Sequence, residues 1–244
     1  SFLGRMSKEQ RQAWDAAYGP KNEAFRKSNL QGKELVRWKY QRYVKDYLRC
    51  VAAVDDGVGR IMESLDELGL SENSIVIYSS DQGFYLGEHG WYDKRWIYEE
   101  SLKMPLVMRW PGKIKAGAKI EKLTQNIDFA PFFLEAAGAE VPAEIQGMSL
   151  MPLFKKQDAP WRKAIYYHYY EAGGHGVPAH FGVRGERYKL VHFPKSKEWN
   201  LVDLKEDPQE MQSFHADPAY KKTLDQMRAK LSELQKKYGV ENSL

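Results

Sequence analysis

Residues 75–100 of the chain, IVIYSSDQGFYLGEHGWYDKRWIYEE, form the stretch that decides the fold. Residues 75–78 are β-branched or aromatic, and sequence with helical periodicity precedes them. This pattern predicts a short buried strand of an α/β sheet. Asp81 and Gln82 follow where the strand should end, and Gly83 lets the chain turn sharply after them. Because ligands of open α/β sheets gather at the carboxyl ends of strands, we expect a binding site here.

The residue types at this strand end indicate which ligand the site binds. Asp81 offers a carboxylate and Gln82 an amide oxygen. These two hard oxygen ligands suit Ca²⁺, with Mg²⁺ as the alternative. Lys94 follows after a glycine-interrupted loop, which can return a cation to the same place. A divalent ion and an ammonium group together predict an anion site.

Residues 79–105, SSDQGFYLGEHGWYDKRWIYEESLKMP, resemble the second signature region of the sulfatase family, in the alkaline-phosphatase superfamily. The resemblance continues through VDDGVGRIMESLDELGL upstream and through NIDFAPFFLEAAG, QGMSLMPLF, HFGVRGERYKLVHF and LVDLKEDPQE downstream. In that family an Asp-Asn/Gln/His-Gly motif binds the metal, and a lysine just downstream holds the sulfate. The resemblance therefore implies that Asp81 and Gln82 are calcium ligands and that Lys94 is the catalytic sulfate-binding lysine.

Asp93 and Arg95 flank Lys94, so they must lie beside the sulfate if the lysine faces it. A carboxylate next to a planar guanidinium is a common polar grip on a sugar ring, which makes both residues candidate substrate ligands. The alternative is that Arg95 forms a purely structural ion pair, with either Asp93 or Glu99.

Two histidines lie in the glycine-rich loop of residues 171–181. Loops on a rigid scaffold are a usual place for substrate contacts. His180 stands just before the GVR strand, where similar sugar sulfatases place a histidine at the substrate, and His175 is the second candidate in this loop. His89 is tempting as a metal ligand or proton donor, but the family motif indicates instead that it braces its loop.

The resemblance and the order of expected elements predict an α/β fold in two parts. Residues 1–155 are expected to form the C-terminal part of an alkaline-phosphatase-like sulfatase core, with the metal and sulfate region. Residues 156–244 are expected to form a small antiparallel α+β subdomain, because strands at 165–204 precede an amphipathic helix at 217–238.

Helical patterns account for much of the first part. A capping box that starts at Ser7 predicts a short helix, which Gly19-Pro20 should end. A second, long helix is predicted for residues 35–68, and Asp128 suits the N-cap of a later one. Cys50, the single cysteine, lies on an apolar stripe of the long helix and is predicted to be buried as a small hydrophobe.

The sulfatase nucleophile is a formylglycine made from a Cys/Ser-x-Pro/Ala-x-Arg motif, and this chain contains no such motif. Cys50 is followed by Val-Ala-Ala-Val. We therefore expect a missing N-terminal part of the same enzyme to be the partner that supplies the formylglycine, and this chain alone to be inactive. The resemblance implies a periplasmic or extracellular location.

The implied reaction is hydrolysis of sulfate esters of glycans, with 6-O-sulfated N-acetylglucosamine as the leading substrate. One alternative is a phosphodiester or phosphonate hydrolase of the same superfamily. Another is a non-catalytic fragment or glycan-binding module. A net charge of +4 among 244 residues is too small and dispersed to argue for nucleic acid. No apolar run approaches the roughly 20 residues of a membrane span.

Overall fold

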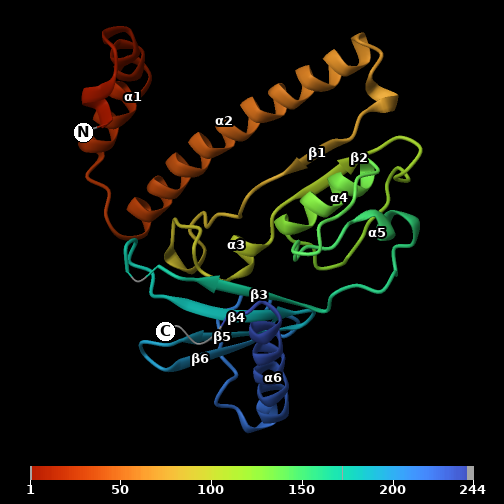
Figure 1. The fold of residues 1–244 in the computed structure, drawn as a ribbon. Helices are drawn as coiled ribbons and strands as arrows, with labels where there is room; N and C mark the ends of the chain where they lie inside the picture. The colour runs from red at the N-terminus through yellow and green to blue at the C-terminus, as the bar shows by residue number, and fades with distance from the viewer. Residues whose placement is uncertain (1, 172, 241–244) are drawn as a thin grey trace. The chain divides into compact units, whose positions relative to one another are not determined.

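The computed structural model describes residues 2–171 and 173–240. The chain separates into two compact units, Ser1–Glu63 and Ser64–Leu244, which are described one at a time (Figure 1). The boundary predicted between residues 155 and 156 falls inside the second unit and stays a prediction. Within the described residues, no helix combines the length and apolar character that crossing a membrane requires.

The first unit contains a short 3₁₀ helix, Phe2–Arg5, helix α1 (Lys8–Ser28) and most of helix α2 (Gly32–Glu67). The predicted capping box at Ser7 is confirmed. The predicted end of α1 at Gly19-Pro20 is wrong, because the helix continues to Ser28 with Pro20 inside it.

Contacts with α2 explain why α1 continues past Pro20. A proline inside a helix costs about 3 kcal/mol, so the second half of α1 needs support from outside. Phe25 of α1 stacks on Trp38 of α2 with ring centroids 4.0 Å apart, and Arg42 of α2 donates a hydrogen bond to Asn22 of α1. Tertiary packing therefore overrides the local helix-stop signal.

The predicted burial of Cys50 is also wrong, because this residue is exposed. The contacts between α1 and α2 run through Trp38 and Arg42, and Cys50 lies further along α2, beyond them. Neither helix contains a buried residue. Several large apolar side chains of α2 are exposed, namely Val36, Tyr40, Tyr43, Tyr47, Leu48, Val51, Val54 and Ile61.

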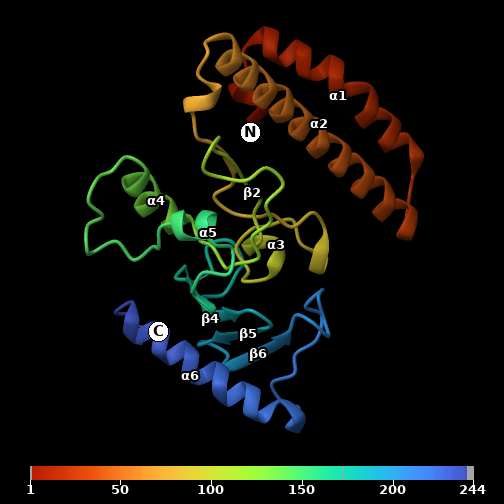
Figure 2. The same ribbon diagram turned by 90° about the vertical axis from the view of Figure 1, so that its right-hand side faces the viewer.

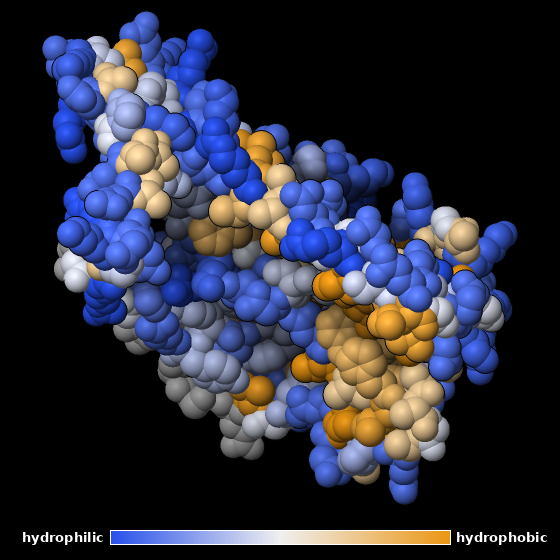
Figure 3. Space-filling model, turned by 90° about the horizontal axis from the view of Figure 1, so that it is seen from above, coloured by the Kyte–Doolittle hydropathy of each residue, from blue (hydrophilic) through white to orange (hydrophobic). Residues whose placement is uncertain are grey.

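The second unit begins with a two-stranded antiparallel sheet, β1 (Val76–Ser79) and β2 (Leu106–Arg109). The strand predicted from residues 75–78 is thereby confirmed, but its predicted burial is wrong, because no residue of β1 is buried and Tyr78 is exposed. The sheet packs against helices α4 (Phe129–Ala136) and α5 (Met151–Lys155) around a core of Phe132, Leu150, Leu153 and Ala159. Figure 3 shows apolar side chains gathered toward the right of the view, the side on which α4 and α5 lie in Figure 1.

Four strands then form an antiparallel sheet in the order β3 (Ala164–Tyr169), β4 (His180–Gly185), β5 (Tyr188–Phe193) and β6 (Glu198–Asp203). Asp217 caps the 3₁₀ turn Pro218–Tyr220, which leads into the last helix, α6 (Lys221–Lys237). The predicted antiparallel sheet with one helix is confirmed.

The two faces of this sheet have different partners. Val183, Leu190 and Leu201 lie on one face and pack against α6. The other face, which carries His180 and Lys189, contacts the segment of residues 93–102, including the short helix α3 (Glu99–Leu102). Figures 1 and 2 show α3 and α6 on opposite sides of the sheet. The sheet therefore supports the segment that follows Lys94.

Candidate active site

The chain leaves β1 at Asp81 and Gln82, as the sequence predicted, and it is fixed there by short contacts. Asn126 Nδ2 donates to the main-chain oxygen of Asp81 over 2.7 Å. Gly83 N–H donates to Ser101 O over 2.8 Å, and a Cβ atom on Gly83 would lie 1.9 Å from the main-chain oxygen of Glu100. Glycine is therefore required at position 83, because the backbone there lies too close to the backbone of α3 to leave room for a side chain.

The two predicted metal ligands offer oxygens, but too few for a complete site. Asp81 is exposed, and the contact of its carboxylate within the described residues is a 3.4 Å approach of Ser80 Oγ. No group of three or more His, Cys, Asp or Glu side chains is arranged to hold a metal in the described part of the chain. Ca²⁺ takes six to eight oxygen ligands, so Asp81 and Gln82 fit only part of its shell.

Asp93 organises the turn that carries Lys94. Its Oδ1 accepts hydrogen bonds from the main-chain N–H groups of Lys94 and Arg95, at 2.6 and 2.8 Å, and its Oδ2 pairs with Arg95 Nη1 at 2.7 Å. Burial alone would raise the pKa of Asp93, but these three hydrogen bonds lower it overall. The Lys94 side chain is exposed, and within the described residues its ammonium has no ion-pair partner.

The alternative ion pair between Asp93 and Arg95 is thus present, at 2.7 Å with both side chains about one-fifth exposed. The other alternative, a pair between Glu99 and Arg95, does not form, because Glu99 binds Arg184 and Lys189 instead. The Asp93–Arg95 pair leaves both side chains partly exposed, so both also remain accessible to a sugar.

His180 lies beside this turn and is fully buried. Its ring stacks on Trp96 and on Tyr167, at 5.6 Å in each case, and the Tyr167 hydroxyl donates to Arg95 O over 2.5 Å. His180 Nδ1 lies 2.9 Å from Pro178 O, while Nε2 is buried without a partner in the described residues. Burial lowers the pKa of His180, so the ring is neutral near pH 7.

The other two histidines differ in their surroundings. His175 is exposed, its Nε2 lies 3.7 Å from Glu171 Oε1, and in the described residues no contact joins it to the Lys94 turn. His89 has a left-handed backbone (φ 55°), stacks on Tyr98 at 4.7 Å, and places Nε2 3.5 Å from Glu100 Oε2. This geometry agrees with the loop-bracing role expected for His89.

A group of charged residues that the sequence did not single out lies behind the turn. Lys189 is fully buried, and its Nζ lies 2.9 Å from Glu99 Oε1 and 2.6 Å from Glu210 Oε1. Arg184 completes the group through a 2.9 Å bond to Glu99 Oε2. Lys189, in the predicted strand YKLVHF, was the sequence signal for this charged group, because a charged residue at an inward-facing strand position requires a buried partner.

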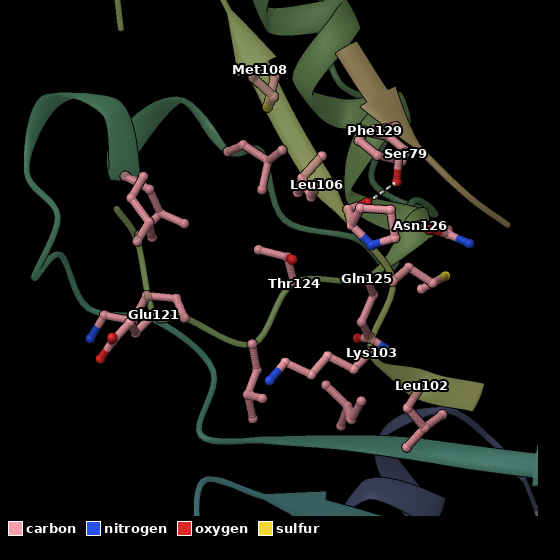
Figure 4. Close-up of a pocket in the computed structure, with 18 of the residues that line it drawn as sticks. Ser79, Leu102, Lys103, Leu106, Met108, Glu121, Thr124, Gln125, Asn126 and Phe129 are labelled. Atoms are coloured by element: carbon pink, nitrogen blue, oxygen red, sulfur yellow. Dashed lines mark hydrogen bonds between the residues drawn. The ribbon is translucent and has the colours of Figure 1, made fainter. Parts of the chain in front are cut away.

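A cavity of about 720 Å³ lies next to the strand end (Figure 4). Its wall includes Ser79, Lys103, Gln125 and Asn126, the residue that also binds the main chain of Asp81. The residues predicted to bind metal, sulfate and sugar do not line this cavity. It is therefore separate from the predicted site.

Acid should weaken the second unit through two carboxylates. Burial would raise the pKa of Glu99, but Arg184 and Lys189 lower it from 4.5 to about 2. The hydrogen bonds of Arg187 lower the pKa of Asp203 from 3.8 to about 2. Both groups therefore add stability that is complete above their unfolded values and is lost as pH falls toward 2.

We expect the urea midpoint of unfolding to fall steeply between about pH 4.5 and pH 2, and Asp203→Asn to reduce that fall. A midpoint that stays constant over this range would contradict the two assigned pKa shifts.

Comparison with known protein families identifies the family to which this chain belongs. A family model described as "N-sulphoglucosamine sulphohydrolase, C-terminal" matches residues 87–237, and one described as "Sulfatase" matches residues 5–139. The chain belongs to the sulfatase family. The resemblance that the segment 79–105 carried is confirmed, and with it the expected fold class of this chain.

Individual relatives agree with this family. The chain is 47% identical over 243 residues to an N-acetylglucosamine-6-O-sulfatase of Bacteroides thetaiotaomicron, covering 98% of this chain and 44% of that protein. It superimposes with a TM-score of 0.92 and 45% identity on BT4656 in complex with its substrate D-glucosamine-2-N,6-O-disulfate, covering 98% of this chain and 50% of that one.

A hydrolase of a different ester is also similar. The phosphonate monoester hydrolase of Agrobacterium radiobacter matches with a TM-score of 0.69 and 27% identity, over 77% of this chain and 40% of that chain. In each of these comparisons the chain spans half or less of the relative's length.

Proposed function

We propose that this chain is part of an enzyme that hydrolyses sulfate esters of glycans, with 6-O-sulfated N-acetylglucosamine as the substrate. The observation that carries the proposal is the turn of Asp93, Lys94 and Arg95, which presents an exposed ammonium without an ion pair in the described residues and leads into Trp96, on which the buried His180 stacks. The 47% identity to an N-acetylglucosamine-6-O-sulfatase supports this substrate class.

Each residue has a role in the proposed reaction. The Lys94 ammonium balances charge on the sulfate oxygens as the ester bond breaks, which lowers the barrier most if the group is held in place beforehand. Asp93 and Arg95 accept from and donate to sugar hydroxyls. His180 stays a candidate for the sugar through its unpaired Nε2, which is buried in this chain and reaches the sugar only when the side chains that cover it move. His175 is the second, exposed candidate for a sugar contact.

Two further groups belong to the proposal. Asp81 and Gln82 would hold Ca²⁺, or Mg²⁺ in its place, with the remaining oxygen ligands coming from outside this chain, and the ion would draw charge from the sulfate. A formylglycine in a missing N-terminal part of the enzyme would provide the nucleophile. The exposed apolar side chains of α2 agree with a partner surface that covers them. A periplasmic or extracellular location rests on the family resemblance alone.

A phosphonate or phosphodiester hydrolase is the second candidate, because a phosphonate monoester hydrolase has a similar structure. Sulfate and phosphate esters place similar charge on similar oxygens, so the residues in this chain serve either reaction.

The test is a comparison of substrates on the intact protein that contains this chain. With Ca²⁺ present, we expect turnover of 6-O-sulfated N-acetylglucosamine and of a small aryl sulfate, and little of a phenyl phosphonate. Mass spectrometry of the intact protein should find a formylglycine. Faster turnover of the phosphonate would overturn the sulfatase proposal. Turnover by residues 1–244 alone would show that no further part is needed.

A further inference from the structure

The turn that carries Lys94 is tied to the four-stranded sheet by a largely buried network of four charged side chains. Arg184 and Lys189 are cross-strand partners on β4 and β5, and they point to the same face. Like charges in this arrangement repel each other. The carboxylate of Glu99, at the start of α3, lies between them and accepts from both, at 2.9 Å each. The sheet therefore needs Glu99 at this position.

Glu210 completes the network from the far end of the chain. Its Oε1 accepts from Lys189 Nζ, and its Oε2 accepts from the main-chain N–H of Glu99, both over 2.6 Å, although Glu99 and Glu210 are 111 residues apart. The Glu210 side chain is 1% exposed. Two cations and two carboxylates therefore neutralise one another, with the Lys189 and Glu210 side chains closed to water and those of Arg184 and Glu99 17% and 20% exposed.

The backbone of Glu210 is also unusual. Its φ of 54° lies in the left-handed region, which is unfavourable for any residue other than glycine, asparagine or aspartate. Such conformations persist where surrounding contacts enforce them, and they cluster at functional sites. Here the Glu210 N–H bonds to Asp207 O over 3.1 Å, and the Glu210 carboxylate adds two bonds that lead to Glu99, one of them through Lys189.

Other bonds fasten the same segment to the same sheet face. Tyr167 on β3 donates to Arg95 O, and Asn200 on β6 donates to the Tyr98 hydroxyl over 3.2 Å. The residues between these anchors follow Lys94 directly, and Asp93 fixes Lys94 itself. Because only a few residues separate Glu99 from Lys94, a displacement of Glu99 would therefore also displace Lys94.

We propose that Glu210 is a positioning residue: by holding Lys189 and the Glu99 N–H together, it fixes where the Asp93–Lys94–Arg95 turn lies against the sheet. The inference rests on the proposed sulfatase function for its catalytic consequence. Misplacement of a catalytic group by about 1 Å lowers rates by on the order of 10²-fold.

The test uses two Glu210 variants of the intact protein and one matched control. Glu210→Ala removes both bonds, whereas Glu210→Gln keeps one acceptor oxygen and the side-chain volume. Asp203→Asn is the control, because Asp203 is an equally buried carboxylate on the same sheet, but it binds Arg187 and Tyr220 on the face that α6 covers.

We expect Glu210→Ala to lower kcat for sulfate esters by on the order of 10²-fold, with a smaller change in KM, and Glu210→Gln to recover part of the loss. Hydrogen exchange of amides 94–102 should quicken by about tenfold in Glu210→Ala. Asp203→Asn should lower the melting temperature yet leave kcat and these amides within about twofold of the wild type.

Equal effects of Asp203→Asn and Glu210→Ala on kcat and exchange would show that Glu210 is merely structural, and unchanged exchange in Glu210→Ala would overturn the proposal. If Glu210→Ala does not fold, Glu210→Gln decides by the same two measurements. An intact wild-type protein without sulfatase activity would refute the proposed function, while the exchange comparison would still decide whether Glu210 holds the turn.

Discussion

Replacing Lys94 by alanine in the intact enzyme should lower kcat/KM for sulfate esters by about 10²- to 10³-fold, the effect of removing one preorganised donor to a developing negative charge. The exposed ammonium has no ion pair within the described part of the chain, so its loss frees no buried charge and should leave stability nearly unchanged. Rates with a 6-O-sulfated sugar and with a small aryl sulfate should fall together, because both carry the sulfate.

Lys103→Ala is the matched control for this prediction. Lys103 is also exposed, but it lies at the end of α3 and lines the separate cavity. Its removal changes the net charge equally and should alter kcat/KM by less than about threefold. Unchanged activity of Lys94→Ala would remove Lys94 from the site, and an equal loss in Lys103→Ala would indicate a general charge effect.

Replacing Arg162 by methionine should lower the free energy of unfolding by about 3–5 kcal/mol, because it leaves a buried carboxylate without its cation. Asp128 is fully buried and accepts two parallel hydrogen bonds from Arg162, at 2.5 and 2.6 Å. The same carboxylate also accepts from the main-chain N–H groups of Gln125 and Met148, so it cannot turn toward water without breaking them.

Chemical denaturation of the intact protein measures this change. Lys221→Met is the control, because it removes the exposed ion pair between Lys221 and Asp225 on α6, and such pairs contribute about 0–1 kcal/mol. The double variant Arg162→Met with Asp128→Asn should recover part of the loss by neutralising the carboxylate. A loss below about 1 kcal/mol in Arg162→Met would mean that water or another group compensates Asp128.

Local patterns predicted the elements well where neighbouring residues control the backbone. The capping box at Ser7, the strand before Asp81 and the apolar stripe of α6 all depend on contacts within a few residues. The order of strands and helix in the second unit followed from the same information. Predictions that depended on a distant partner were less secure, as α1 shows by continuing through Pro20.

Asp128 is a second residue at which a distant partner overrides a local preference. The sequence indicated an N-cap, and the residue does stand at the start of α4, but its side chain makes no capping bond there. Arg162, which lies after α5, draws the carboxylate into an ion pair. Short-range preference gives way when a buried charge finds a cation far along the chain.

The sequence by itself determined the family of this protein and the residue types offered at the strand end and on the lysine turn, because these are carried by short runs of neighbouring residues. Only the tertiary structure decided which groups meet: His180 against Trp96, Arg95 with Asp93 rather than Glu99, and Glu99 with Lys189 and Glu210. A buried charge can be satisfied by any residue that the fold brings within about 3 Å, and sequence distance does not limit that choice.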